Sequence, residues 1–300
     1  MRAPTLLLGL GLAVAQEALS PSTGSGRTVL ENTGKPMRVE YHCGEEDLRA
    51  AGADCTAEHP CPVYLELAGV EGVGTKIFLT GNIHTSAITL WSVLLASADG
   101  GKSWTEPHER IPGAILEQVQ FVDFQTGWVG GQLVHPLPRD PFLLLTTDGG
   151  ATWRRRPIFD EGRVASLERF WFDSRTQGTL WIDRTHSGDA ESRYERYESL
   201  TGGESWMLRE VSARPIPGAQ APPRETGWRI RADRATKAFH VERQEADRWR
   251  SVAAFLIQLG ECRPPEQQPM EPPAETPEPA APNGSPGVRP APKPPPKFRP

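Results

Sequence analysis

The sequence predicts an all-β protein, a β-propeller of about four to five four-stranded blades followed by a disordered, proline-rich C-terminal tail. The main observation is a short Gly-Gly/Trp motif that recurs about every 50 residues, the length of one propeller blade. The 29 glycines and 30 prolines disfavour helix interiors. No helical period longer than about two turns occurs in the repeated region.

The motif is clearest in three segments. SADGGKSW occupies residues 97–104, TTDGGATW occupies 146–153 and SLTGGESW occupies 199–206. All three have a Ser or Thr, a turn residue, two glycines and a tryptophan at the same offsets, but Thr201 replaces the Asp in the third. A fourth tryptophan, Trp249, follows at a similar interval after a segment that has lost the Asp-Gly-Gly turn.

Each part of the motif has a structural role, and none requires a substrate. The aspartate tolerates turn geometry and accepts bonds from downstream amides, glycine adopts positive φ, and the hydroxyls satisfy loose backbone groups. Tryptophan is wide and flat enough to fill the space between adjacent sheets. We therefore predict structural roles for the following residues: Ser97, Asp99, Gly101, Trp104, Thr146, Asp148, Gly150, Trp153, Ser199, Gly203, Trp206 and Trp249.

A second marker supports four-stranded units. A glycine precedes each tryptophan by roughly half a unit, at Gly81, Gly127, Gly178 and Gly227. In the second unit, turn signals separate four candidate strands, at 116–124, 127–134, 141–147 and 152–158. One such sheet cannot bury both of its faces alone, so stacking of the units against one another is expected.

The motif resembles the bacterial neuraminidase (BNR) repeat, or Asp-box, S/T-x-D-x-G-x-S/T-W. The segments at 97–104 and 146–153 match it fully. A further pattern, F-x-D-x-x-x-G-W-x-x-G at 121–131, is similar to BNR proteins of the photosystem II assembly factor type. The resemblance implies a β-propeller. It implies little about function, because Asp-boxes occur in sialidases, sorting receptors and assembly chaperones alike.

The two ends of the chain differ from the repeated region. Arg2, an apolar run at 6–15 and a small-residue site at 13–15 form the pattern of an export signal. The residues after Arg263 are rich in proline, glutamate and alanine, a composition that cannot bury enough apolar surface to fold. We expect a signal peptide at 1–15, a linker at 16–35, the propeller at 36–262 and the disordered tail at 263–300. The exported protein would be periplasmic or secreted, without a membrane span.

The last unit departs most from the repeat, so the sequence does not show directly how the ring closes. The segment before Gly227 is too rich in proline for an inner strand. We hypothesise that residues 37–43 pair into the last sheet and close the ring, locked by a disulfide between Cys43 and Cys262. Cys55 and Cys61 would then form a small loop staple. The alternative is a local arrangement among Cys43, Cys55 and Cys61 that leaves Cys262 free.

Catalytic chemistry has little support in the sequence. A net charge of −5 and a pI near 5.9 argue against nucleic-acid binding, and no metal or cofactor motif occurs. Sialidase chemistry would need an arginine cluster, an acidic residue and a tyrosine nucleophile with a glutamate base. Tyr194 and Tyr197 are each followed by a glutamate, Glu195 and Glu198, but we expect these residues to form an exposed, alternating strand face.

Two functions follow from this. The first is an exported, non-enzymatic propeller that binds a protein partner in the cell envelope or assembles a complex, with loops 134–141 and 186–196 as variable surfaces. The alternative is a sialidase-like glycoside hydrolase or a glycan-binding propeller. A central pocket in which arginines and acidic side chains converge would favour the alternative. A pocket of serine, glycine and apolar groups would favour the first.

Overall fold

The computed structural model describes residues 28–41, 43–44, 48, 52, 55–56, 58–188, 193–219 and 226–262. These residues belong to one compact unit that extends to Pro265. The expected signal peptide at 1–15 and tail at 263–300 lie outside the described residues, as does most of the expected linker. No helix among the described residues is long and apolar enough to cross a membrane.

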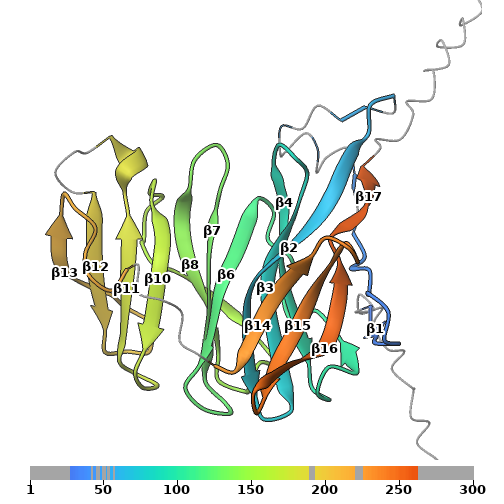
Figure 1. Cartoon of the computed structure of the whole chain (residues 1–300). Helices are drawn as coiled ribbons and strands as arrows, with labels where there is room; N and C mark the ends of the chain where they lie inside the picture. Colours follow the sequence, from blue (N-terminus) through green and yellow to red (C-terminus); the bar gives the residue numbers. More distant parts are fainter. Residues whose placement is uncertain are drawn as a thin grey trace, which may run out of the picture. The chain divides into compact units, whose positions relative to one another are not determined.

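The fold is all-β, with one short 3-10 turn, η1 (Thr185–Ser187), among the described residues. Four antiparallel sheets follow one another along the chain (Figure 1). The first contains β17 (Gln258–Cys262), β2 (Cys61–Val73), β3 (Lys76–His84) and β4 (Thr89–Ser97). The second contains β6 (Ala114–Phe121), β7 (Gly127–Leu133), β8 (Arg139–Thr146) and β9 (Arg154–Pro157).

The third sheet contains β10 (Ser166–Phe172), β11 (Gly178–Asp183), β12 (Tyr194–Ser199) and β13 (Met207–Ser212). The fourth has only three strands, β14 (Trp228–Asp233), β15 (Ala238–Glu245) and β16 (Arg248–Leu256). A two-residue strand, β1 (Leu30–Glu31), pairs with β5 (Ser103–Trp104). The described residues therefore contain four large sheets and this two-stranded one, and the expectation of four-stranded blades is wrong for the fourth sheet, which has three strands.

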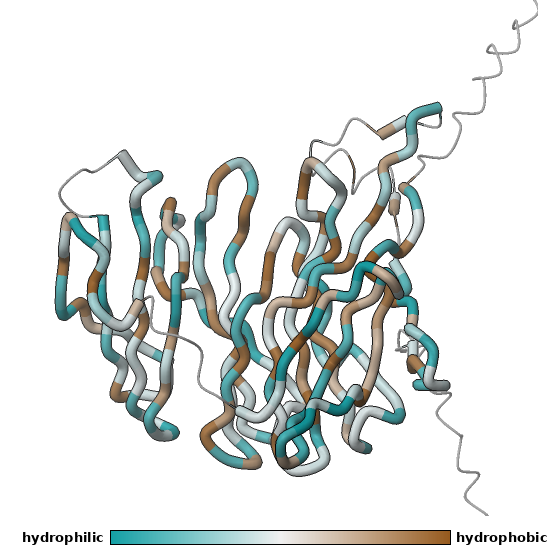
Figure 2. The backbone as a smooth tube through the Cα atoms, viewed as in Figure 1, coloured by the Kyte–Doolittle hydropathy of each residue, from teal (hydrophilic) through white to brown (hydrophobic). Residues whose placement is uncertain are grey.

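The sheets pack face to face through three hydrophobic clusters. One joins the fourth sheet to the first and includes Phe255, the second joins the first sheet to the second and includes Phe78, and the third joins the second sheet to the third and includes Phe172. Hydrophobic and hydrophilic residues alternate along the strands, as expected for sheets that present side chains on both faces (Figure 2). This arrangement is consistent with a β-propeller.

The repeated hairpins carry a fixed hydrogen-bond network. In the first, the Ser97 hydroxyl donates to Asp99 Oδ1 at 2.8 Å and accepts the Gly101 amide at 2.8 Å. The Asp99 carboxylate accepts both the amide and the hydroxyl of Ser103, at 3.0 and 2.7 Å. The Trp104 indole donates to the Gly101 carbonyl at 3.2 Å. These bonds, the Ser103 hydroxyl first, hold the pKa of Asp99 well below its ordinary range.

The second hairpin repeats this geometry. Asp148 accepts from Thr146 at 2.8 Å and from the amide and hydroxyl of Thr152 at 3.0 and 2.5 Å, and the Trp153 indole donates to the Gly150 carbonyl at 3.1 Å. Burial would by itself raise the pKa of the Asp148 carboxyl, but the bonds from Thr152 and Thr146 lower it to about 2. The charged carboxylate is thus the stable form in the folded hairpin.

The third hairpin keeps the turn with Thr201 in the place of the aspartate. The Ser199 hydroxyl accepts the Gly203 amide at 2.9 Å, and Thr201 Oγ1 accepts the Ser205 amide at 2.9 Å. A hydroxyl supplies one oxygen where a carboxylate supplies two. Trp206 is only partly buried against the third cluster, with its ring 5.9 Å from that of Phe172.

Each Gly-Gly hairpin packs against a neighbouring sheet. The hairpin of the first sheet contacts the fourth sheet, that of the second contacts the first, and that of the third contacts the second. A Cβ added to Gly150 would lie 2.3 Å from the Phe78 ring of the first sheet, and one added to Gly101 would lie 2.5 Å from Val252 of the fourth. For the third hairpin, the Trp128 indole of the second sheet donates to the Gly202 carbonyl at 2.8 Å. The paired glycines therefore permit close contact between sheets as well as positive φ.

The fourth sheet has no such hairpin, and its tryptophan does not act as a wedge. Trp249 is 37 % exposed and lies under the Arg229 guanidinium, 4.2 Å from the ring centroid. The predicted place of Trp249 between sheets is therefore wrong. Within the described part of the chain no hydrophobic cluster joins the fourth sheet to the third. The ring is open at the one interface where the Gly-Gly hairpin is missing.

The outward faces at this opening are charged. On the third sheet, Arg196 bonds to Glu198 and Glu210. On the fourth, Glu242 accepts from Arg229 and Arg231 at 2.6 and 3.0 Å. Polar outer faces of this kind are typical of the end repeats of a stacked array, which need no further neighbour.

The hypothesis that residues 37–43 pair into the last sheet and close the ring is met only in part. Met37 does pair with β16, through a parallel bridge to Phe255, but among the described residues no full strand joins the fourth sheet and the ring stays open. The segment instead runs beside β17, where Arg38 and Tyr41 donate to the carbonyls of Leu259 and Glu261. It is β17 that completes a sheet, by pairing with β2 of the first.

The cysteines and the N-terminal residues fasten this region. Cys43 is bonded to Cys262 and Cys55 to Cys61, so no cysteine is free. Residues 28–35, which the sequence assigned to a linker, lie on the first sheet. There the Asn32 amide donates to a carbonyl of the first hairpin and to one of β16, at 2.8 and 2.9 Å. The N-terminal segment therefore bridges the first and fourth sheets.

We predict that Gly150→Ala destabilises the fold by about 2–4 kcal/mol, because the added methyl both strains a positive φ and overlaps the Phe78 ring. Gly100→Ala is the matched control, since Gly100 also has positive φ but no atom within 4 Å of its Cβ position. It should cost about 1–2 kcal/mol. Urea unfolding measures both, and equal losses would contradict the packing role.

We further predict that Thr201→Asp stabilises the protein by about 1 kcal/mol at pH 7, and that Asp148→Thr destabilises it by a similar amount. Because the pKa of Asp148 falls from 3.8 to about 2 on folding, its contribution is fully present above about pH 4 and is lost as the pH falls to about 2. Unfolding curves at pH 6 and pH 2.5 test this. A pH-independent difference between Asp148→Thr and the wild type would argue against the carboxylate.

Candidate functional site

A wide concave feature lies where strands of the four sheets converge. A cavity of about 990 Å³ is lined by residues of β2, β6, β10 and β14, the first strand in chain order of each sheet. In the second and third sheets the marker glycines, Gly127 and Gly178, open the second strand, whereas Gly227 directly precedes β14. In the second and third sheets the strand before the marker glycine, β6 or β10, lines the cavity. Among the described residues the fourth sheet has no strand before Gly227, and β14, which follows this glycine, lines the cavity instead.

Glutamine side chains hold one wall together. Gln118 and Gln120 of β6 donate to the carbonyls of Phe170 and Phe172 of β10, at 2.8 and 2.7 Å, and their side-chain oxygens accept the amides of the same two residues. The inner edge of β10 has no strand partner, so these amides supply the bonds that a strand would make. The register between the two strands is therefore set by side chains.

Two carboxylates project into the cavity beside this wall. Among the described residues, neither Glu117 of β6 nor Glu168 of β10 is within ion-pair distance of a cationic group. Glu117 stays exposed to solvent, but its partial desolvation in the concave site, followed by the charges of Glu168 and Glu66, raises its pKa. Burial and then Asp183 raise the pKa of Glu168. This side of the cavity carries negative charge without a counter-ion.

The arginines of the cavity are engaged by other groups. Arg229 donates to Glu242 at 2.6 Å and stacks on Trp249. Arg169 donates to the Gly218 carbonyl at 3.1 Å. The acidic and basic side chains therefore converge on one cavity.

Two tryptophans complete the walls. Trp228 of β14 packs edge-on against Gly72, where an added Cβ would lie 2.1 Å from the indole nitrogen. The Trp171 indole donates to Asp173 at 2.9 Å. Both residues line the cavity and are only half-buried. Their anchored rings offer rigid surfaces for a flat or cationic ligand group.

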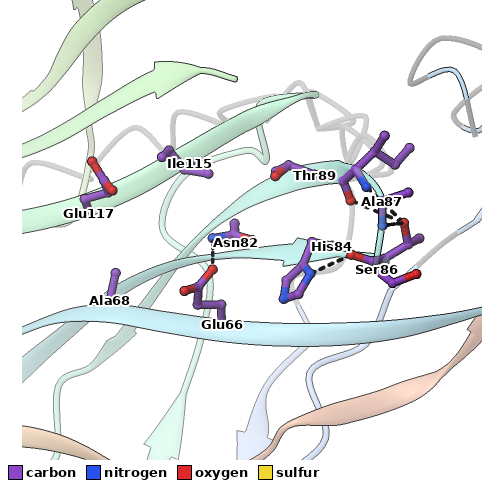
Figure 3. A pocket seen from close by; sticks show the side chains of 11 residues that line it. Glu66, Ala68, Asn82, His84, Ser86, Ala87, Thr89, Ile115 and Glu117 are labelled. Atoms are coloured by element: carbon purple, nitrogen blue, oxygen red, sulfur yellow. Dashed lines mark hydrogen bonds between the residues drawn. The ribbon is translucent and has the colours of Figure 1, made fainter. Parts of the chain in front are cut away.

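A smaller pocket of about 270 Å³ adjoins the cavity and shares Glu117 with it (Figure 3). It lies between β2, β3 and β6. Glu66 accepts a bond from Asn82 at 3.0 Å, and His84 Nδ1 lies 2.7 Å from the Thr85 carbonyl. Glu66 thus extends the acidic side of the cavity. Among the described residues no group of His, Cys, Asp or Glu could hold a metal ion.

The residues singled out by the sequence motif lie elsewhere. None of the twelve hairpin residues lines the cavity, because the hairpins join the third and fourth strands of the repeat, away from the inner strands. The described parts of loops 134–141 and 186–196 do not line it either. Sequence reasoning missed Glu117, Glu168 and Trp228. Their signal is a charged or aromatic residue that breaks the apolar alternation of an inner strand.

The tyrosine and glutamate pairs do not form a sialidase site. The Tyr197 hydroxyl donates to Glu195 at 2.7 Å, and Arg184 bonds the same carboxylate at 2.7 Å. Tyr197 and Glu195 are buried, so the expected exposed face is wrong for these two residues. They pack between the second and third sheets, outside the cavity. Burial, followed by the bond to Glu195, raises the pKa of Tyr197, which disfavours a nucleophilic tyrosinate.

We predict that Glu168→Gln lowers the pKa of Glu117, because it removes the neighbouring negative charge. Carboxyl-carbon NMR titration measures this pKa. Glu204→Gln is the control, because Glu204 is paired with Arg154 and Arg156 outside the cavity and should leave Glu117 unchanged. An unchanged Glu117 titration in Glu168→Gln would show that the two carboxylates do not interact.

No family model and no curated protein matches the chain. Among solved structures it is similar to one described as "YCF48 bound to D1 peptide". The similarity is 15 % sequence identity with a TM-score of 0.36, over 64 % of this chain and 56 % of that one. The match therefore spans just over half the length of that protein.

Proposed function

We propose that this protein is an exported, non-enzymatic Asp-box propeller that binds a protein partner in the cell envelope, and that its central cavity takes a polypeptide segment carrying lysine or arginine. The observation that carries the proposal is the two carboxylates of Glu117 and Glu168, which have no ion-pair partner in the described part of the chain, in the cavity on which all four large sheets converge. Export is supported by the signal pattern at 1–15 and by the absence of free cysteines, which suits an oxidising compartment.

The electrostatics favour a cation. The pKa values of Glu117 and Glu168 are raised by desolvation and by neighbouring acidic groups. An incoming ammonium or guanidinium group would supply a positive charge beside both carboxylates. Half-buried Trp171 and Trp228 line the same cavity, and the Arg243 guanidinium, 5.9 Å from the Trp228 ring centroid, is a cation already placed over one of these rings. A cavity of about 990 Å³ holds several residues of an extended peptide, more than a single side chain needs.

A glycan-binding role is the second candidate. Arginine and acidic side chains converge with tryptophans in the same cavity, which is the arrangement expected above to favour the glycan alternative. A sialidase-like hydrolase is not favoured, because Tyr197 and Glu195 lie outside the cavity. The second candidate is therefore glycan binding and not glycan hydrolysis.

The test is binding of fluorescent peptide pools that differ only at one central residue: lysine, arginine, leucine or glutamate. We expect the lysine and arginine pools to bind and the glutamate pool not to bind. Glu117→Gln with Glu168→Gln should weaken binding about tenfold or more, the loss of roughly 1.4 kcal/mol or more, while Glu204→Gln should not change it. Affinity should fall at high salt, and also as the pH drops through the raised carboxyl pKa values.

A glycan array run in parallel separates the two candidates. Glycan binding would replace peptide binding as the proposed function if glycans bind the wild type but not the double variant, and no peptide pool binds. Peptide binding that is indifferent to both glutamates would place the partner on another surface.

A further inference from the structure

The two disulfides meet at one point of the first sheet. Strand β17 runs antiparallel to β2, and the last rung of this ladder places Cys262 opposite Cys61. These two cysteines are not bonded to each other: Cys262 forms a disulfide with Cys43, and Cys61 forms one with Cys55. Residues opposite each other in a ladder share a sheet face.

The unbonded pair has the spacing of a disulfide. Opposed residues of an antiparallel pair have Cα atoms about 4.5–5.5 Å apart, and disulfides span about 4.4–6.8 Å. The two existing bonds have Cα separations of 5.6 and 5.4 Å. Three pairings thus converge within one small region, and Cys61–Cys262 needs little backbone movement.

The four sulfur positions differ in access. Cys43 and Cys61 are partly exposed, whereas Cys55 and Cys262 are buried. An external thiol therefore reaches Cys43 more easily than its partner. The thiolate released by attack on Cys43 would be that of Cys262, which already faces Cys61.

We propose that these four cysteines form a thiol–disulfide exchange site for small-molecule thiols, in which one two-electron reduction leaves a Cys61–Cys262 disulfide and frees Cys43 and Cys55. A thiolate attacks Cys43 Sγ, forms a mixed disulfide and expels the Cys262 thiolate. Cys262 attacks Cys61 Sγ and expels the Cys55 thiolate, which takes a proton. A second thiol resolves the mixed disulfide, so that two thiols become one external disulfide and two protein thiols.

The exchange would free one end of the chain and keep the other in place. After it, the N-terminal segment retains only non-covalent contacts, such as those of Asn32, Arg38 and Tyr41. Strand β17 would be bonded directly to its ladder partner β2. The site thus uncouples the N-terminal segment from the sheet without opening the sheet.

Partial reduction of the full-length protein tests the proposal. The protein is equilibrated in graded glutathione buffers, alkylated with N-ethylmaleimide and mapped by non-reducing peptide mass spectrometry. The two-thiol species should carry the alkyl group on Cys43 and Cys55 and retain a Cys61–Cys262 link. A two-thiol species that retains Cys43–Cys262 or Cys55–Cys61 overturns the proposal.

Matched double variants provide a second measurement. Cys43→Ser with Cys55→Ser leaves Cys61 and Cys262, which should oxidise to a disulfide in the glutathione buffer. Cys43→Ser with Cys61→Ser leaves Cys55 and Cys262, which should remain thiols. If the first variant does not form its bond, or if both variants oxidise equally, the register does not direct the exchange.

Discussion

Close contact between a Gly-Gly hairpin and the neighbouring sheet is the constraint on which the rest of the structure depends. The Asp99 and Asp148 carboxylates hold the turn, while the second glycine leaves room for a side chain of the next sheet. Where this hairpin occurs, two sheets share a hydrophobic cluster. Where the fourth sheet lacks it, the outward faces are charged and the ring is open.

The cavity is a consequence of this incomplete repetition. The second and third sheets contribute an inner strand that precedes the marker glycine, whereas the fourth contributes the glycine-marked strand itself. Side-chain amides of Gln118 and Gln120 replace strand pairing along one wall. The same arrangement leaves Glu117 and Glu168 without a counter-ion. The cavity proposed as the binding site therefore lies where the repeat is incomplete.

The repeat could be predicted because its chemistry is local. A turn with two positive-φ glycines, an acceptor aspartate and a following tryptophan is encoded within eight residues; the first two copies have it in full, and the third has Thr201 in place of the aspartate. The all-β class and the sheets around 116–158 follow from the same local signals. Trp249 was grouped with the other tryptophans although its segment has lost the Asp-Gly-Gly turn, and without that turn it is exposed beneath Arg229 and does not lie between sheets.

The sequence by itself determined the secondary structure, the repeating hairpins and the weak place in the repeat before Gly227, since all three depend on neighbouring residues. Only the tertiary structure decided that β17 rather than residues 37–43 completes a sheet, that the ring is open, and that Glu117, Glu168 and Trp228 meet in one cavity. These features join residues that are far apart in the chain. Their energies depend on packing and on charge across sheets, which no local pattern records.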